Sequence, residues 1–110
     1  MTAGLKTVIY PVTDLARAKP IYTALLGVEP FVDEPYYVGY QVGDQQLGLD
    51  PHGHRDGVTG YWEVEDINAA LETLVSAGAA VVQPVKDVGG GKQTAIVKDA
   101  DGNITGIAQS

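Results

Sequence analysis

The sequence repeats itself at about half its length, and this repeat constrains the fold more than any other feature. The pattern Val-x-Asp-Leu-x-x-Ala at residues 12–18 recurs as Val-x-Asp-Ile-x-x-Ala at residues 64–70. The two aspartates, Asp14 and Asp66, are therefore 52 positions apart in a chain of 110 residues. A period of half the chain predicts two copies of one structural unit.

Two further matches extend the repeat toward the end of each copy. Gly27 and Gly78 each follow an apolar helical pattern, and Leu-Gly-Leu at 47–49 is echoed by Thr-Gly-Ile at 105–107. The three matches occur in the same order in both halves. Their order favours a duplication over a chance likeness of short segments.

The first copy begins with a predicted strand over residues 5–10, an alternating segment that carries β-branched residues. Thr13 or Asp14 is a candidate N-cap for the helix that follows, because a short side-chain oxygen accepts hydrogen bonds from first-turn amides. Gly27 is expected to end the helix. The apolar residues predicted on one face of this helix are Leu15, Ala18, Tyr22, Leu25 and Leu26.

Pro20 lies inside this helical pattern, and its missing N–H removes the hydrogen bond to the Ala16 carbonyl. We therefore expect a kink, or a short first turn with the main helix restarting near Lys19. Three extended segments are predicted next, at 29–33, 36–42 and 45–50, with Gly43 at positive φ in the turn between the last two.

The second copy follows the same order after a polar, turn-rich segment at 51–57. A strand is predicted from Thr59 to Val64, Asp66 caps a helix, and Gly78 ends it. The apolar helix face is Ile67, Ala70, Leu71, Leu74 and Val75. The remaining strands are expected near 79–83, 93–98 and 104–108, with turns at 89–91 and 99–103.

These elements define an α+β fold of two tandem β-α-β-β-β modules. A chain of 110 residues fits one domain. We assign module one to 1–50, the linker to 51–57 and module two to 58–110.

Composition narrows the function classes. The chain contains no cysteine, which excludes disulfides and zinc–thiolate sites and fits a reducing, cytoplasmic location. The net charge of −7, with no cluster of basic residues, argues against nucleic-acid binding. No apolar run reaches the ~20 residues that a transmembrane helix needs, and the first residues lack a signal-peptide core.

The sequence resembles the vicinal oxygen chelate superfamily, which includes glyoxalase I, extradiol dioxygenases and the fosfomycin- and bleomycin-resistance proteins. The matching residues are Val-Thr-Asp-Leu at 12–15, Ile21-Tyr22 followed by Leu-Leu-Gly at 25–27, Val-Glu-Asp-Ile at 64–67 and the turn at 98–103. The resemblance covers essentially the whole chain and is greatest to short glyoxalase-like members. It implies curved mixed sheets around a concave site, and a homodimer.

Metal-binding relatives carry a ligand early in the first strand of each module and a glutamate in its last strand. Carried over onto this sequence, those positions hold Thr7 and Thr59, and Gly48 and Gly106. Neither glycine nor threonine is a good ligand for zinc, nickel, manganese or iron. We therefore expect no metal and no other cofactor, and the glyoxalase or dioxygenase reaction is not carried over.

If the two threonines face the concave surface, strand alternation predicts Ile9, Tyr61 and Glu63 on it as well, with Gln46 and Asp50 beside Gly48. The same alternation points Trp62 and Val64 toward the helices as core. The predicted ligand-binding set is Thr7, Ile9, Tyr37, Gln46, Gly48, Asp50, Thr59, Tyr61, Glu63 and Gly106. Tyrosines beside small and polar residues suit a planar organic ligand. The alternative is that the tyrosines fill the cavity or build the dimer interface.

Other motifs carry weaker signals. His52 and His54 are read as part of a solvated linker in preference to a metal or proton-transfer site. The acidic turn at 99–103 is read as a hairpin and not a calcium loop, and Gly-Gly-Gly at 89–91 as a flexible turn or a lid. No catalytic residue is assigned, although Asp50 and Glu63 could act as an acid–base pair.

Three functions remain open from the sequence. The first is metal-independent binding of a small organic molecule, as in bleomycin-resistance proteins, by a homodimer. The second is a glyoxalase-like lyase or isomerase, or a dioxygenase-related enzyme, with non-standard site residues. The third is a structural or regulatory interaction module, which a cavity filled by Tyr37 and Tyr61 would favour.

Overall fold

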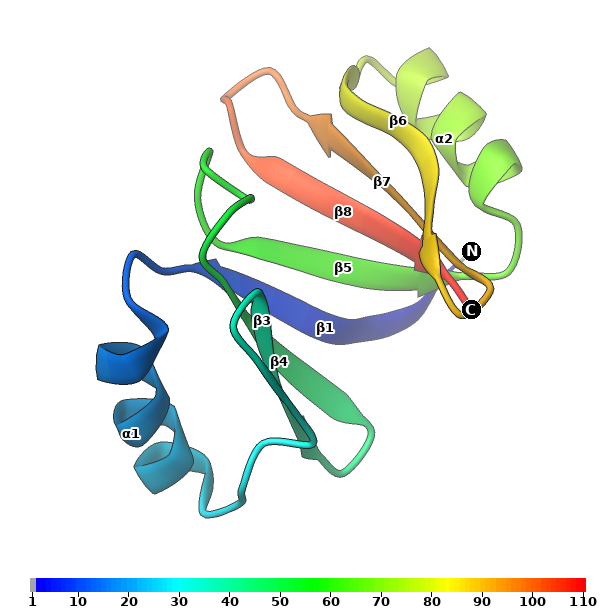
Figure 1. Ribbon diagram of the computed structural model, residues 1–110. Helices are drawn as coiled ribbons and strands as arrows, with labels where there is room; N and C mark the ends of the chain where they lie inside the picture. Colours follow the sequence, from blue (N-terminus) through cyan, green and yellow to red (C-terminus); the bar gives the residue numbers. More distant parts are fainter. Residues whose placement is uncertain (1) are drawn as a thin grey trace. The chain divides into compact units, whose positions relative to one another are not determined.

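The computed structural model describes residues 2–110, which form eight strands and two helices (Figure 1). In chain order these are β1 Thr2–Pro11, α1 Leu15–Leu26, β2 Val32–Glu34, β3 Tyr37–Val42, β4 Gln45–Asp50, β5 Thr59–Val64, α2 Ile67–Ser76, β6 Ala80–Gly89, β7 Lys92–Lys98 and β8 Ile104–Gln109. Two successive β-α-β-β-β runs confirm the predicted α+β class. Residues 6–59 form one compact unit, and residues 2–5 with 60–110 form another.

In the first unit, β4 pairs parallel with β1 and antiparallel with β3, and β2 forms the edge beside β3. The buried side chains of Val38, Tyr40 and Leu49 all point to one face of these strands. Helix α1 covers that face with Leu15, Ala18, Tyr22 and Leu26. The opposite face of the sheet has no helix against it within this unit, and it carries the predicted site residues.

Both ends of α1 follow the sequence prediction. Asp14 is the N-cap, and its Oδ1 accepts hydrogen bonds from the N–H groups of Ala16 (2.9 Å) and Arg17 (3.3 Å). Gly27 ends the helix in the left-handed region at φ 70°. The predicted restart near Lys19 is wrong, because the helix runs without interruption through Pro20. Only one hydrogen bond is lost there, in the N-terminal half of the helix.

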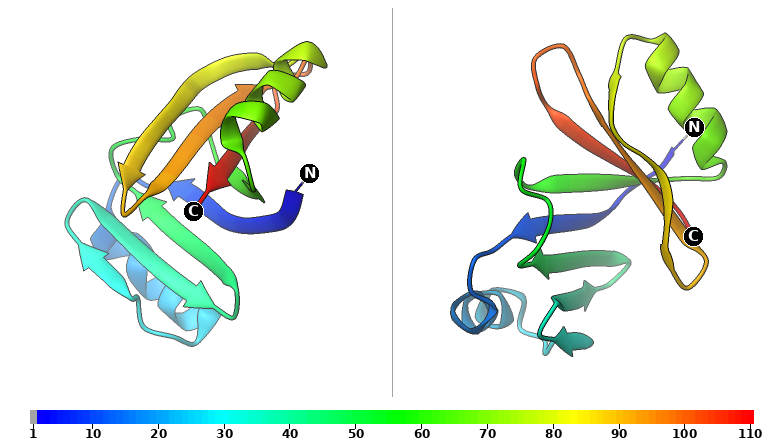
Figure 2. Two further views of the ribbon diagram at one scale, coloured as in Figure 1. Left: turned by 90° about the vertical axis from the view of Figure 1, so that its right-hand side faces the viewer. Right: turned by 45° about the horizontal axis from the view of Figure 1, so that its top comes forward.

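The second unit repeats this plan. Strand β8 pairs parallel with β5 and antiparallel with β7, and β6 is the edge strand beside β7. Helix α2 lies along one face of these strands (Figure 2) and packs Ile67 and Ala70 against Val64, Ala95 and Ile107. No helix among residues 2–110 is long and apolar enough to cross a membrane.

Strand β6 differs most from its prediction. It was expected to end at residue 83 but continues to Gly89, past Pro84, and its pairing with β7 shifts register at three places. Proline cannot donate a ladder hydrogen bond, and edge strands and bulges are where a sheet tolerates it. Strand β2, in turn, is confined to residues 32–34 instead of 29–33.

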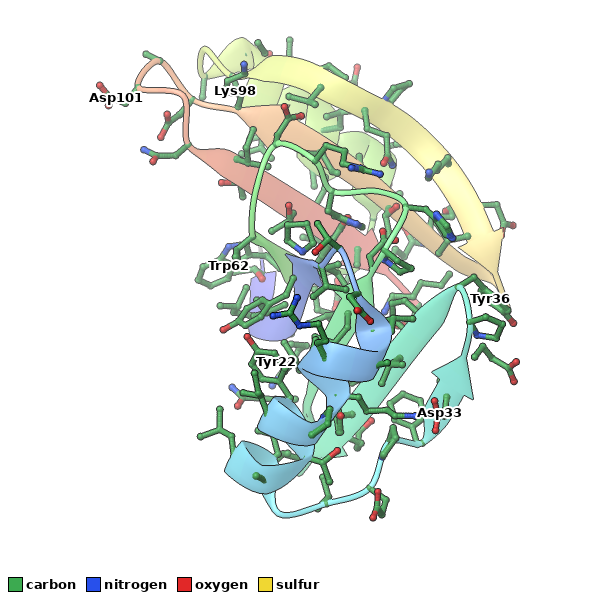
Figure 3. The ribbon with its side chains drawn as sticks, turned by 60° about the vertical axis from the view of Figure 1, so that its left-hand side comes forward. Tyr22, Asp33, Tyr36, Trp62, Lys98 and Asp101 are labelled. Atoms are coloured by element: carbon green, nitrogen blue, oxygen red, sulfur yellow. The ribbon has the colours of Figure 1, made fainter. Side chains whose placement is uncertain are left out.

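Three apolar residues expected in the core lie at the surface. Leu25 on α1 is 72% exposed and Val75 on α2 is 45% exposed. Trp62, expected beside Val64 in the core, is 40% exposed (Figure 3). Periodicity in the sequence therefore does not by itself decide whether these three side chains are buried.

Tyr40 joins the sheet of the first unit to α1. Its ring is fully buried, and its hydroxyl donates to the Lys19 carbonyl (3.0 Å) and lies 2.8 Å from the Thr23 hydroxyl. We predict that Tyr40→Phe lowers the free energy of unfolding by about 1 kcal/mol, because a buried acceptor loses its donor. A urea denaturation series measures this. Tyr36→Phe, at an exposed position, is the matched control and should have no effect.

Candidate functional site

Six of the predicted site residues of the first unit, all on β1, β3 and β4, lie on the sheet face opposite α1. The register pairs Thr7 with Gln46 and Ile9 with Gly48 across β1 and β4. Asp50 follows two residues after Gly48 on the same face, and Tyr37 reaches it from β3. The sheet therefore brings an apolar side chain, an aromatic ring, an amide and a carboxylate onto one surface.

The ring of Tyr37 lies directly against the backbone of Gly48. A β-carbon at Gly48 would overlap the Tyr37 hydroxyl, and it would lie 2.7 Å from Tyr37 Cζ and 2.6 Å from Ile9 Cδ1. Real β-carbons do not approach other atoms so closely. Glycine at this position is therefore what allows the ring to occupy the surface.

The second unit shows the same arrangement with a different tyrosine. Tyr61 of β5 pairs with Gly106 of β8, and a β-carbon at Gly106 would lie 2.5 Å from Cδ1 and 2.7 Å from Cε1 of Tyr61. Tyr61 is only 6% exposed. Both positions at which the resemblance implies a glutamate ligand thus hold a glycine with a tyrosine ring packed on it.

The predicted polar residues Thr7, Thr59 and Glu63 are buried or make hydrogen bonds within the protein. Thr59 is buried, and its hydroxyl donates to the Gly57 carbonyl (3.1 Å). Thr7 is also buried. Glu63 Oε1 accepts from the Ser110 backbone N–H (3.1 Å) and hydroxyl (2.8 Å). Glu63 is thus held at the end of β5, and its role as an acid–base partner of Asp50 stays a prediction.

Asp50 pairs with His54. Its Oδ2 lies 2.7 Å from His54 Nδ1, and both side chains are less than one-fifth exposed. Its Oδ1 accepts from the backbone N–H groups of His52 (2.8 Å) and Gly53 (3.0 Å). His54 holds a left-handed backbone conformation at φ 57°, which is uncommon for a residue with a side chain. His54 of segment 51–57 therefore forms a built carboxylate–imidazole pair with the end of β4, which the interpretation as a solvated linker missed.

These contacts set the charge on Asp50. Burial alone would raise the pKa of this carboxyl, but the hydrogen bonds from the His52 N–H and the His54 ring outweigh burial and hold the pKa below 3.8. The pKa of Tyr37 is raised, first by its own burial and then by the negative charge of Asp50. The surface at neutral pH thus presents a carboxylate beside a protonated phenol.

The two turn motifs are accounted for by hairpins. Asp99 Oδ1 accepts from the backbone N–H groups of Asp101 and Asn103, both at 2.9 Å, which is the hairpin turn predicted for 99–103. Gly90 and Gly91 form the tight turn between β6 and β7, both at positive φ. Local backbone structure therefore explains both motifs.

The residues present do not fit a metal centre. Threonine and glycine occupy all four positions that the resemblance assigns to ligands. Within residues 2–110, no three His, Asp or Glu side chains are grouped so that they could hold a metal ion. The tyrosine rings on Gly48 and Gly106 also occupy the space that a carboxylate side chain would need there.

Comparison with known proteins defines the family. The family model of the Glyoxalase/Bleomycin resistance protein/Dioxygenase superfamily matches residues 4–106. The chain therefore belongs to this superfamily. No curated protein matches the chain significantly.

Solved structures share the fold at low sequence identity. A hypothetical protein from Bacillus halodurans C-125 matches with a TM-score of 0.79 at 14% identity, covering 96% of this chain and 93% of its own. A superfamily member from Vibrio splendidus 12B01 gives 0.71 at 19% identity, with coverages of 94% and 95%. A variant of Streptomyces coelicolor methylmalonyl-CoA epimerase, in complex with 2-nitronate-propionyl-CoA, gives 0.76 at 17% identity, with coverages of 100% and 99%.

The contact between Tyr37 and Gly48 predicts a double-mutant cycle. Gly48→Ala should lower the free energy of unfolding by about 1–3 kcal/mol, because its new methyl group overlaps the ring. In a Tyr37→Ala background the same substitution should cost clearly less, and the difference is the coupling energy. Gly39→Ala is a milder comparison and should cost less, because a β-carbon at Gly39 would lie 3.1 Å from Tyr37 Cε2. Additive effects of the two substitutions would show that the ring does not rest on Gly48.

The carboxylate of Asp50 predicts a pH dependence of stability. The pKa of Asp50 is lower in the folded state than its ordinary value of 3.8, so the ionised carboxylate stabilises the fold at pH values above 3.8. This contribution is lost as the pH falls through the pKa of the folded state. Asp50→Asn should therefore be less stable than the wild type at pH 7 and approach it below pH 3.8. Denaturation curves across pH measure this, with Asp56→Asn as control. A constant difference at all pH values would contradict it.

Proposed function

We propose that the protein binds a small organic molecule without a metal ion, in the manner of the bleomycin-resistance members of its superfamily. The observation that supports this most strongly is the tyrosine ring packed on a glycine at each position where relatives that use metal place a glutamate. The surface around Tyr37 combines an aromatic ring, apolar carbon and a few polar groups, which is the usual character of an organic-ligand site.

The polar groups on this surface are pre-organised. Gln46 Nε2 donates to Gln41 Oε1 (2.8 Å), and Gln41 Nε2 donates to the Gly43 carbonyl (2.7 Å). Asp50 is fixed by its two backbone donors and by His54. Groups fixed before binding lose little conformational entropy when a ligand arrives.

The structural neighbours are compatible with this function. The epimerase structures contain organic acyl-CoA molecules, one of them methylmalonyl-CoA with NH4+. These structures share only the fold with this chain. They support the proposal because they show that the fold can accommodate a small organic ligand.

Metal independence is tested by thermal melting of EDTA-treated protein with nickel, manganese, zinc or iron added. We expect no rise in melting temperature, because the four ligand positions hold threonine and glycine. A metal at about 100 times its dissociation constant would add about 2.7 kcal/mol, or roughly 10 °C in a domain of this size.

The His52→Gln variant is the control for weak binding at a surface histidine. A shift of roughly 10 °C that persists in this variant would contradict metal independence. A panel of small organic molecules tested on the same metal-free protein completes the experiment. If none of them raises the melting temperature, the protein is better explained as a structural or regulatory interaction module.

A second function is favoured by one observation, the half-buried pair of Asp50 and His54. A carboxylate on Nδ1 fixes the imidazole tautomer and orientation, as in acid–base enzymes. This arrangement suits a glyoxalase-like lyase or isomerase, or a dioxygenase-related enzyme, with non-standard site residues. Turnover of a methylglyoxal hemithioacetal that is lost in His54→Gln would place this function ahead of simple binding.

We further propose that the protein is a homodimer and acts in the cytoplasm. The dimer rests on the resemblance to the superfamily, and the compartment on the absence of cysteine. Light scattering after size exclusion tests the dimer.

A further inference from the structure

Tyr37 lies in a row of side chains between two carboxylates on the face opposite α1. Glu34 of β2 is its direct partner in the antiparallel pair β2–β3. On the other side, Val38 pairs with Leu49, so Asp50 of β4 comes opposite Tyr37 at the next position. Directly opposite residues of an antiparallel pair place their β-carbons about 5 Å apart. The ring is therefore flanked by one acidic side chain on each neighbouring strand.

A second aromatic ring extends this surface. Phe31 Cε1 lies 3.3 Å, and Tyr37 Cε2 3.1 Å, from the position that a β-carbon would take at Gly39. The two rings thus converge above the same glycine. Phe31 is 55% exposed. Its exposed ring, next to the ring of Tyr37 at one glycine, forms a surface on which a flat group can stack.

The charge of this surface has one sign. The strand residues on it are Thr7, Ile9, Pro11, Val32, Glu34, Tyr37, Gly39, Gln41, Gln46, Gly48 and Asp50, with no lysine or arginine among them. The nearby lysines point elsewhere: Lys19 binds Asp33 on the α1 side (3.0 Å), and Lys6 binds Asp44. His54 contacts Asp50 from segment 51–57.

We propose that the ligand is an organic cation, an ammonium or amidinium carried on an aromatic or apolar group. This inference rests on the proposed binding function and names its ligand class. The cationic head lies over the face of Tyr37, which attracts it through the ring quadrupole, while Glu34 and Asp50 supply opposite charge from both sides. The aromatic or apolar part stacks on Phe31.

The whole chain reinforces this choice. A net charge of −7 attracts cations from solution and repels anions. A ligand rich in phosphates, such as the acyl-CoA molecules bound by the epimerase neighbours, would meet two carboxylates at this surface. The charge preference of this surface is thus determined by the side chains on β2, β3 and β4.

The test uses three probes of one shape: benzamidinium, neutral benzamide and anionic benzoate. We expect benzamidinium to bind at least about ten-fold more tightly than benzamide, and benzoate not to bind. Titration followed by NMR chemical shifts of backbone amides locates the site and gives the affinities. Binding of benzamidinium should weaken as salt is raised from about 20 to about 500 mM, because salt screens exposed charges.

Matched variants test whether benzamidinium binds at this surface. Glu34→Gln should weaken benzamidinium binding by about five-fold, and Tyr37→Leu by a similar factor. Asp33→Asn is the control, because it removes the same charge from the same strand on the opposite face and should leave the affinity unchanged. Glu34 is exposed, so its variant folds and decides the outcome even if Tyr37→Leu does not.

The outcomes separate this inference from the function on which it rests. If benzamide or benzoate binds at this surface as well as benzamidinium does, the cation preference is wrong while binding of an organic molecule stands. If Asp33→Asn weakens benzamidinium binding as much as Glu34→Gln does, the affinity depends on the net charge of the protein, and the proposed location of the site is wrong. If none of the three probes, nor any molecule of the panel above, shifts amides of this face, the binding function itself fails.

Discussion

The structure depends on one pairing made twice, the parallel alignment of the first and last strands of each repeat. In the first unit β1 pairs with β4, and in the second β5 pairs with β8. A parallel pair requires a long connection, and here the helix and two strands between them supply it. The helix then covers one face of its sheet with apolar residues. The other face is left without a helix in its own unit, and most of the predicted site residues lie on that face.

On that face, two glycines determine which side chains can pack against the backbone. Gly48 and Gly106 lie opposite the first strand of their unit, and each has a tyrosine ring against its backbone. A carboxylate side chain at either position would have to displace that ring. The glycine and the ring packed on it are thus one structural feature at both positions. Around Gly48 this leaves a surface with an aromatic ring and fixed polar groups.

Much of this was predictable from local chemistry. The repeat, the aspartate caps and the β5 bounds follow from spacing and propensity, and the structure confirms them. Strand β6 runs past its predicted end at residue 83 because an edge strand tolerates Pro84, and spacing does not reveal which strand lies at an edge. The pair of Asp50 and His54 was missed because His54 adopts a left-handed backbone that no periodicity signals. Tyr37 was among the predicted site residues, but its contact with Gly48 depends on a side-chain conformation that the sequence does not reveal.

The two units reach the same arrangement from different sequence positions. Tyr61 lies on the first strand of its unit, where the repeat aligns it with Ile9. In the first unit the ring comes from β3, and Ile9 packs beside it against the same glycine. The two tyrosines do not occupy equivalent positions of the repeat, so the duplication does not explain both contacts. The common cause is steric, because the missing side chain at each glycine leaves space that a neighbouring aromatic ring fills. The surroundings then differ, since Glu63 is held by Ser110 while Asp50 is held beside His54. The repeat therefore fixes the shape of both faces, and the side chains around each ring determine its chemistry separately.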